Sequence, residues 1–504
     1  MIKTKTKAGA RASGFQFIVH RSAFIVLVIA QAITLSGCGA RRTPNLERLF
    51  ASAREREGKR PVIIIPGILG SQLVNRETGE VVWPSAFRSS GDGLSLPTSP
   101  DLQANRDDLY ALKILRTAKL ARLAPELYIY YELLEALQKY AGYREGNWET
   151  PPEGGDHDTF YVFEYDWRRD NVESARALIQ RIEELKRKLG RPDLRFNILA
   201  HSMGGLIARY AAMYGDHDLP ADDTPLRANW EGARHISKIF MIGTPNEGSA
   251  EAFATLLEGY SITEGLRRRV RLLNKLARED AFTTPSIFQL LPHKHTARFL
   301  DESLQPLEVD LYDPSVWKRY GWAAVNDAGY RERYVQGKTG AEDPPREGGS
   351  LEELDAYFAS VLKRARRFHE ALDAVEGVEK VPVPLFAFGG DCEETLAAPI
   401  ILRDERRDTW TTLTSPRAFR RRDGTRVSRK EAINAMYEPG DGRVTRRSLL
   451  GESLVGDGRP NSNLFNTALP IAYATFICDL HSDLQRNRTL QDNALTLLVS
   501  EVLN

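Results

Sequence analysis

The segment FNILAHSMGGLIARY, residues 196–210, contains one serine in a setting where it could act as a nucleophile. An apolar run typical of a buried strand precedes Ser202, and a pattern with helical spacing follows it. A turn between such a strand and helix exposes the hydroxyl but needs small flanking residues, because the two elements nearly touch. Ala200 and Gly204 meet that need, although glycine is more usual at the first position. The spacing therefore predicts a nucleophile elbow at Ser202.

A serine hydroxyl is a weak nucleophile, so it needs a base that accepts its proton and an acid that orients this base. Where such an elbow occurs, the chain order is serine, then acid, then histidine. Of the histidines that follow Ser202, only His481 lies near the C-terminus. It follows a long apolar run, residues 469–478, and precedes a final helical pattern. We therefore expect His481 to be the base.

Two aspartates suit the role of the acid. Asp391 directly follows the apolar run VPLFAFGG, and Asp441 lies in the glycine-framed turn EPGDGRVTRRS. Either aspartate could instead only stabilise its own turn. The residues alone leave this choice open.

Acyl transfer by a serine also needs two backbone N–H groups that stabilise the developing oxyanion. One donor should be Met203, the residue after the nucleophile. The other should come from a turn after an early strand. The segment PVIIIPGILGSQL, residues 61–73, offers a β-branched run that is ended by proline and glycine. We expect Leu69 in this turn to be the other donor.

Several motifs together resemble the lecithin:cholesterol acyltransferase-like branch of the α/β-hydrolases, which includes lysosomal phospholipase A2 and phospholipid:diacylglycerol acyltransferase. The matching pieces, which extend over most of the mature chain, are PVIIIPGILGSQL, VVWP, EYDWR, AHSMGG, IGTPNEGS, SIFQLLP, GDGRV and LHSDL. The resemblance implies an α/β fold with a mostly parallel central sheet, flanking helices and a helical cap or lid insertion. It also implies a serine esterase, lipase or O-acyltransferase.

The resemblance bears on the two open site assignments. Members of this family place a hairpin insertion before a GDG-type acid that is followed by valine, which favours Asp441 over Asp391. The same carry-over assigns the oxyanion donors to Leu69 and Met203. The chain departs from the family at Ala200, and it has no cysteines for the disulfide that the family carries near its lid.

The N-terminus predicts where this chemistry takes place. Basic residues precede an apolar run, residues 22–35, that ends in LSGC at Cys38. The run is shorter than the about 20 residues that span a bilayer, which favours a lipoprotein signal peptide over a transmembrane helix. We expect cleavage before Cys38, lipid attachment to its thiol and a bacterial envelope protein held on the membrane surface. Gly39 favours the outer membrane, facing the periplasm or the cell surface.

The composition is that of an ordinary globular enzyme, with a formal charge of +1 and 42% hydrophobic residues. Such a balance gives no indication of a nucleic-acid partner. No zinc-ligand spacing occurs, so we expect no metal, and we expect no cofactor. Cys392 and Cys478 lie near the ends of two late strands. They could form a disulfide if these strands are neighbours, or they could remain buried thiols.

The order of these segments predicts the domain boundaries. Residues 1–37 are the signal peptide and 38–59 a polar linker. The hydrolase core occupies 60–249, with an insertion near 85–150 that could act as a lid and a helix over 171–189. Residues 250–381 form a helical cap, because their helical pattern is far longer than a loop. The core resumes over 382–504 and carries an arginine-rich hairpin insertion at 400–435.

The sequence therefore predicts a lipid acyl hydrolase or acyltransferase that acts on phospholipid or related esters through an acyl-enzyme. A cap suits a long acyl chain, and Trp83 and Trp167 are candidates to line the groove, although such residues more often belong to the core. A carboxylesterase for small esters and a non-catalytic envelope lipoprotein on a hydrolase fold are the alternatives. The arginine-rich hairpin is either a solvated face or a surface for anionic headgroups.

Overall fold

The computed structural model describes residues 43–84, 93–119, 126–222, 224, 226–261, 275–337, 348–375, 381–405, 407–451, 454–455, 459–460, 467 and 469–500. The chain divides into two units, Met1–Asn45 and Leu46–Asn504, and every element below belongs to the second. The predicted signal peptide and Cys38 lie outside the described residues. Among the helices that the structure describes, none is both long and apolar enough to cross a membrane.

The core of the second unit is a parallel sheet. Its strands are β1 (Val62–Ile65), β7 (Arg144–Glu145), β8 (Thr159–Val162), β9 (Phe196–His201), β10 (Ile236–Ile242), β15 (Leu385–Gly390) and β24 (Ile471–Ile477). They lie in the order β24-β15-β10-β9-β1-β8-β7, and every neighbouring pair is parallel. This confirms the predicted mostly parallel central sheet.

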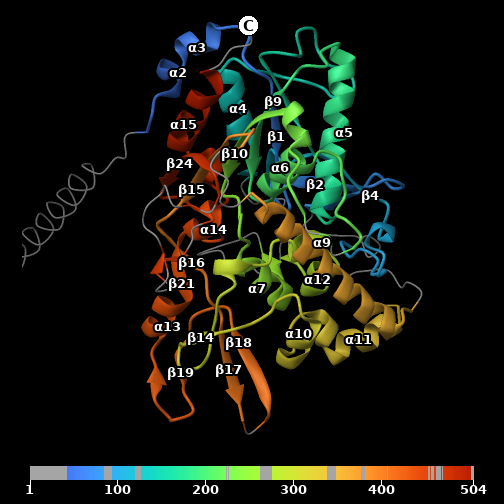
Figure 1. Cartoon of the computed structure of the whole chain (residues 1–504), viewed down its shortest axis with the longest axis vertical. Coiled ribbons are helices and arrows are strands. Elements are labelled where there is room, and N and C mark those ends of the chain that lie inside the picture. Colours follow the sequence, from blue (N-terminus) through green and yellow to red (C-terminus); the bar gives the residue numbers. More distant parts are fainter. Residues whose placement is uncertain are drawn as a thin grey trace, which may run out of the picture. The chain divides into compact units, whose positions relative to one another are not determined.

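Strands β1, β8, β9 and β15 are buried along their whole length, which explains why they are mostly apolar runs. In β1, Val62 and Ile64 belong to one core cluster, and Ile63 and Ile65 belong to the other. Helices α4 (Tyr131–Lys139) and α15 (Arg488–Val499) contribute to the first cluster, whereas α5 (Asn171–Leu189), α6 (Met203–Tyr214) and α12 (Leu351–Asp373) contribute to the second. Figure 1 shows α4 and α15 on one side of the strands and α5 on the other.

Two short helices precede β1. They are α2 (Leu46–Leu49) and α3 (Ala51–Glu55), and Leu46 and Phe50 are buried in the same cluster as α4 and α15. We predicted a polar linker over this stretch. The structure instead packs it against the sheet, because its few apolar side chains recur at helical spacing.

Helix α5 has the bounds that its sequence predicts. Leu178, Ile179 and Ile182 lie on its buried face. The Asp170 side chain accepts a hydrogen bond from the Val172 backbone N–H and so caps the first turn. Gly190 ends the helix with a φ of +65°, a left-handed conformation that glycine adopts readily.

A three-stranded antiparallel sheet follows β1. It consists of β2 (Ser71–Asn75), β3 (Val81–Trp83) and β4 (Leu109–Ile114), and a short pair, β5 (Thr117–Lys119) and β6 (Glu126–Tyr128), comes after it. Residues 85–92 and 120–125 of the predicted lid insertion lie outside the described residues, so a lid over 85–150 stays a prediction.

The segment between β10 and β15 consists mainly of helices, with four two-residue strands, where it is described. Its elements are α7 (Ala250–Glu258), β11 (Tyr260–Ser261), β12 (Lys275–Leu276), α8 (Arg278–Phe282), α9 (Pro285–Phe288), β13 (Phe299–Leu300), β14 (Pro306–Leu307), α10 (Pro314–Tyr320), α11 (Ala328–Val335) and α12. Aromatic rings fill its centre, where Phe253 lies 4.8 Å from Trp322 and Trp317 lies 5.6 Å from Phe358 between ring centroids. These helices occupy the stretch that we predicted as a cap.

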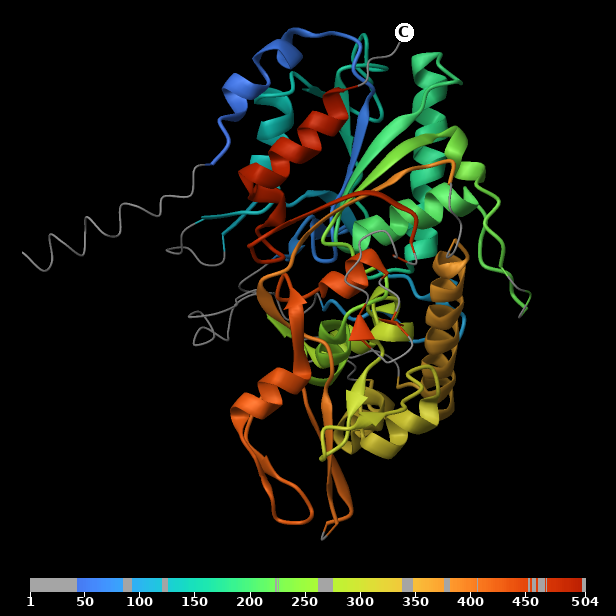
Figure 2. The ribbon, with the colours of Figure 1, turned by 60° about the vertical axis from the view of Figure 1, so that its left-hand side comes forward.

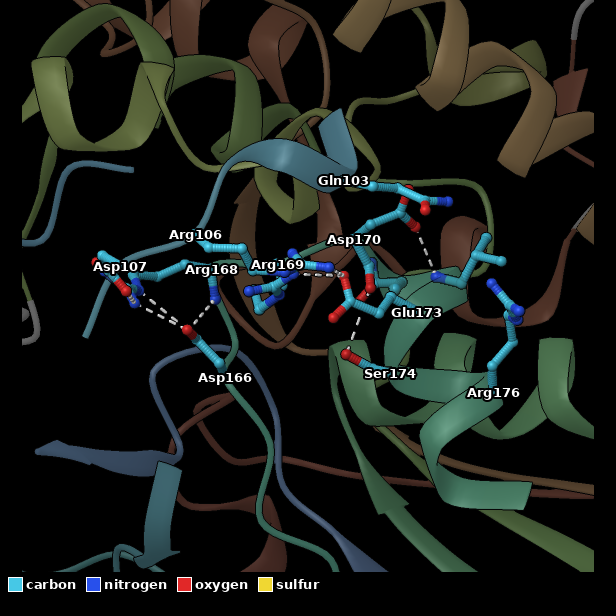
Figure 3. A network of polar contacts seen from close by, with 12 residues as sticks. Gln103, Arg106, Asp107, Asp166, Arg168, Arg169, Asp170, Glu173, Ser174 and Arg176 are labelled. Atoms are coloured by element: carbon cyan, nitrogen blue, oxygen red, sulfur yellow. Dashed lines mark hydrogen bonds and ion pairs between the residues drawn. The ribbon is translucent and has the colours of Figure 1, made fainter. Parts of the chain in front are cut away.

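Charged groups join this cap segment to the core. From α12, Arg364 contacts Asp170 at 2.5 Å and Asp218 at 2.6 Å. Next to this junction, the buried Arg168 side chain is paired with Asp107 at 2.6 Å and Asp166 at 2.8 Å. Figure 3 shows both carboxylates pointing toward the Arg168 guanidinium. Because breaking such a pair leaves a charge without its counterion, the contacts of Arg364 stabilise the attachment of α12 to the core.

A second insertion separates β15 from β24. It contains β16 (Glu393–Leu396), β17 (Ile400–Asp404), β18 (Thr409–Leu413), β19 (Phe419–Arg420), β20 (Arg426–Val427), α13 (Arg429–Met436), β21 (Tyr437–Gly440), α14 (Arg446–Leu450), β22 (Leu454–Val455) and β23 (Arg459–Pro460). The predicted hairpin at 400–435 is in fact two hairpins, β17–β18 and β19–β20, followed by a helix. Both hairpins extend away from the central sheet (Figures 1 and 2).

Candidate active site

The turn at Ser202 joins β9 to α6 and has the geometry of a nucleophile elbow. Ser202 has φ +53° and ψ −125°, a strained conformation for a residue with a side chain. The following helix runs so close to β1 that a Cβ added at Gly204 would lie 2.6 Å from the Pro66 carbonyl oxygen. Only glycine fits there, which is the requirement from which we predicted the elbow. Strain at this position holds the hydroxyl where the turn needs it.

The structure brings Ser202, His481 and Asp441 into one hydrogen-bonded chain. His481 Nε2 lies 2.9 Å from Ser202 Oγ, and His481 Nδ1 lies 2.8 Å from Asp441 Oδ2. All three residues are buried, with at most 7% of each exposed. A carboxylate can only accept, so Nδ1 carries the proton and Nε2 is left to accept the serine hydroxyl proton.

The loop around Asp441 leaves one carboxylate oxygen available to His481. The other oxygen, Oδ1, accepts backbone N–H groups of Arg443 at 3.0 Å and Val444 at 2.7 Å. The His481 backbone N–H donates to the Asp441 carbonyl oxygen at 2.8 Å. These bonds fix the ring against the acid and stabilise the ionised carboxylate. Asp391 lies at the end of β15, and the bond to His481 comes from Asp441.

The predicted oxyanion turn lies directly against the nucleophile. Gly70 N–H donates to the Gly67 carbonyl at 3.1 Å, and Leu69 within this turn has φ +62°. A Cβ at Gly67 would lie 2.8 Å from Ser202 Cβ, so the turn and the elbow touch. Met203 is the first residue of α6. Both predicted donor residues are therefore beside Ser202, and their role as donors stays a prediction.

Trp83 and Trp167 belong to the core and not to an open groove. Both side chains are fully buried, and their rings meet edge to face with centroids 5.6 Å apart. Trp83 Nε1–H donates to the Leu69 carbonyl at 2.9 Å, and Trp167 Nε1–H donates to the Ser71 carbonyl at 3.3 Å. Both indoles point at backbone carbonyls, which matches the core alternative given for them in the sequence analysis. They support the turn that carries Leu69.

A second polar chain beside Ser202 escaped the sequence analysis. Gly67 N–H donates to Tyr130 Oη at 2.8 Å, and Tyr130 Oη lies 2.8 Å from His201 Nδ1. His201 Nε2 lies 3.2 Å from the His481 carbonyl oxygen. Burial, with a smaller contribution from His481, lowers the pKa of His201 to about 3. His201 is therefore neutral, and the directions of these bonds assign its proton to Nε2.

The position of His201 at the end of a buried, mostly apolar strand was a sequence signal for this chain, since a buried polar group needs partners. Tyr130 gave no such signal. It lies far from both partners in sequence, and only the fold brings its hydroxyl between them.

Cys392 and Cys478 form a disulfide, with Cα atoms 5.3 Å apart. It joins the residue that precedes β16 to the residue that follows β24, which decides between the two expectations for these thiols. Within the described part of the chain, the single group with metal-ligand chemistry is these two cysteines with Glu393, and its sulfurs are bonded to each other. The disulfide lies three residues before His481 in sequence and so fixes the base loop to the neighbouring strand end.

Comparisons with known proteins agree with this architecture. The family model of lecithin:cholesterol acyltransferase matches residues 95–326, a stretch that includes Ser202. No curated protein matches the chain. Among solved structures, the Tle4-Tli4 complex is similar over 88% of this chain and 99% of that chain, with 14% identity and a TM-score of 0.53. This likeness shows a shared fold.

Two further solved structures are similar at lower TM-scores. The mature form of the Bacillus licheniformis lipase BlEst2 has 10% identity and a TM-score of 0.31, over 88% of this chain and 93% of that chain. EstA from Clostridium botulinum has 12% identity and a TM-score of 0.33, over 89% of each chain. The family match supports lipid acyl hydrolase or acyltransferase activity in general. The chain thus has an α/β-hydrolase fold, and its residues 95–326 match the lecithin:cholesterol acyltransferase family model.

Proposed function

We propose that the protein is a serine-dependent lipid acyl hydrolase or acyltransferase that acts on phospholipid or related acyl esters. One observation carries the proposal: the hydrogen-bonded chain of Ser202, His481 and Asp441 at a nucleophile elbow. A base 2.9 Å from a serine hydroxyl is within proton-transfer reach, and a buried carboxylate on its far nitrogen holds the required tautomer.

In the first half-reaction, Ser202 Oγ attacks the ester carbonyl carbon while His481 Nε2 accepts the hydroxyl proton. The carbonyl electrons move to its oxygen, and the N–H groups of Leu69 and Met203 stabilise the negative charge that forms there. The intermediate then collapses, the bond to the alcohol breaks, and His481 gives its proton to the leaving oxygen. The product is an acyl-enzyme on Ser202.

In the second half-reaction, an acceptor hydroxyl attacks the acyl carbonyl carbon while His481 again removes the proton. The intermediate then collapses, the bond between the acyl carbon and Ser202 Oγ breaks, and His481 returns the proton to Ser202 Oγ. Water as acceptor yields a fatty acid, and a lipid alcohol yields a new ester. Asp441 stays ionised throughout and stabilises the imidazolium that forms in each step. Because the site is buried, these electrostatic interactions are stronger than they would be in water.

The lipid substrate class rests on the family match and on the aromatic cap segment, because a long acyl chain needs a covered apolar site. We extend the proposal to the location: Cys38 carries lipid and holds the enzyme on a bacterial envelope membrane. Labelled palmitate should enter the full chain and not its Cys38→Ala form. A Cys38→Ala form that stays firmly membrane-bound would reject this part.

The decisive experiment compares the protein with its Ser202→Ala form on mixed phospholipid vesicles that contain a sterol and a long-chain alcohol. Mass spectrometry should detect fatty acid or acylated alcohol only with Ser202 present. The product identifies the acyl acceptor, which is water for a fatty acid and the alcohol for a new ester. Activity on small soluble esters alone would instead indicate a carboxylesterase. A serine-directed fluorophosphonate that fails to label Ser202 in folded protein would indicate a non-catalytic protein.

A further inference from the structure

Residues 417–430, called here the basic segment, form a strongly positive stretch of the chain. It holds seven basic residues and one acidic residue, a net charge of +6 (7 − 1), whereas the whole chain has +1. The other residues together therefore carry −5 (1 − 6). Six of the seven basic side chains are exposed, and these are Arg417, Arg420, Arg422, Arg426, Arg429 and Lys430.

The hairpin in this segment places two like charges opposite each other. In the register of β19 and β20, Arg420 pairs with Arg426, and both side chains are exposed. Like charges directly opposite on a strand pair destabilise it. Within the described chain neither guanidinium has a carboxylate partner, and Arg422 alone of the segment forms ion pairs, with Glu302 at 2.7 Å and Glu405 at 3.5 Å.

The helix that follows also carries positive charges at positions that destabilise it. Arg429 and Lys430 are the first two residues of α13, where the helix dipole disfavours cations. Backbone N–H groups at the N-terminus of α13 already have hydrogen-bond partners, because Ser428 and Glu431 form a capping box there. An anion that meets this surface would therefore be bound by side chains and not by the helix end. Hairpin and helix both become more stable when an external anion neutralises them.

We propose that the basic segment is a docking surface for the anionic headgroups of a lipid bilayer. Residues that destabilise their own helix or strand pair are expected at functional sites. Here the β19–β20 hairpin and helix α13, which are adjacent, both carry such residues. The hairpins extend away from the central sheet, so a flat partner can reach the segment (Figure 2). The choice of a lipid surface over another polyanion rests on the proposed function, since the substrate would lie in that bilayer.

The location of the segment also fits this role. Helix α13 continues directly into β21, which ends at the residue before Asp441. An enzyme docked through the basic segment would thus be held by the same insertion that supplies the acid of its site. Each basic residue near an anionic leaflet strengthens binding about fivefold.

The test uses the compact unit Leu46–Asn504, which contains every core cluster and lacks the proposed lipid anchor. Its sedimentation with vesicles of phosphatidylcholine is compared with that on equimolar phosphatidylcholine and phosphatidylglycerol. We expect binding only to the anionic vesicles, weakening as salt rises. Four substitutions in the segment should weaken it about 600-fold, and these are Arg420→Gln, Arg426→Gln, Arg429→Gln and Lys430→Gln.

A matched control removes four exposed charges elsewhere, through Lys113→Gln, Lys139→Gln, Arg187→Gln and Arg488→Gln. It should bind within about threefold of the parent, since charges beyond a Debye length from the bilayer are screened. Equal loss in both variants would show that only net charge matters and would overturn the proposal. So would unchanged binding of the segment variant, or retention on heparin without binding to the anionic vesicles.

Two readouts separate this inference from the proposed function. The Ser202→Ala unit should bind vesicles like the parent, and the segment variant should hydrolyse a soluble short-chain ester like the parent. The second readout also establishes that the variant is folded. Vesicle binding through the segment without any esterase activity would reject the proposed function and leave the docking surface standing.

Discussion

Replacing Tyr130 with phenylalanine removes one oxygen that links the oxyanion turn to the elbow. This oxygen accepts the Gly67 N–H and donates to His201 Nδ1, both at 2.8 Å. Burial raises the pKa of Tyr130 far above its usual value, so the hydroxyl stays protonated and can donate. Phenylalanine keeps the ring, so the substitution deletes these two bonds and little else.

The loss has two expected consequences. Each buried group left without a partner destabilises the fold by about 1–3 kcal/mol, so the free energy of unfolding should fall by about 2–6 kcal/mol for the two groups. A full oxyanion donor contributes about 3–4 kcal/mol to the barrier. The substitution should loosen the turn that carries Leu69 but leave its N–H group in place. We therefore expect the loss of about a third of this barrier lowering, which is close to a tenfold fall in kcat. KM should change little, because the donor acts mainly in the transition state.

The assay measures kcat and KM on a soluble ester, together with unfolding by urea. Tyr143→Phe is the matched control, because Tyr143 is also buried and its hydroxyl donates to the Arg60 carbonyl at 3.1 Å, outside the site. We expect the control to lose stability and keep kcat. If Tyr130→Phe behaves like the control, the chain through His201 is only structural and the reasoning fails.

Three further predictions concern the acid, the disulfide and the pH range. Asp441→Asn should lower kcat by about 10³–10⁴-fold, and Asp391→Asn should leave it within about threefold, as measured on a soluble ester. Because the disulfide closes a loop across a sequence separation of 86, replacing both cysteines with serine should lower the free energy of unfolding by about 4–5 kcal/mol in urea titrations. Burial, chiefly, lowers the folded pKa values of His201 and His369 to about 3, so below pH 6.5 only the unfolded chain binds these protons. Stability should therefore be intact above pH 6.5 and fall by about 4 kcal/mol between pH 6.5 and 5, and a pH-independent free energy of unfolding would contradict this.

The parts of the site that sequence predicts are those set by local chemistry. The elbow needs small residues at fixed offsets from Ser202, and the strand before it needs apolar residues on both faces, so both are visible in a short window. His481 was found in the same way, from a strand and a helix on either side of it. The hydrogen-bond chain through Tyr130 could not be predicted, since the sequence around a buried tyrosine does not indicate which backbone group its hydroxyl will contact.

The tryptophans illustrate a second limit of the sequence. Trp83 and Trp167 lie in motifs that resemble those of the family, and the sequence left open whether they line a groove or belong to the core. In the structure their indole N–H groups bond to the carbonyls of Leu69 and Ser71. A residue of such a motif can thus serve to position the backbone near the site. Sequence cannot separate the two roles, because both require a large aromatic side chain close to the site.

The choice between Asp391 and Asp441 shows why an insertion can hide an acid. β16 and β21 pair antiparallel, and this stem returns the chain to the end of β15, where Asp441 forms a bridge with Glu393. A Cβ added at Gly390, the last residue of β15, would lie 2.8 Å from Asp441 Cβ. Two aspartates that are distant in sequence therefore occupy the same strand end, next to the loop that carries His481. Periodicity predicts that strand end but not the stem that closes over it, so only pairing between distant residues brings Asp441 to His481.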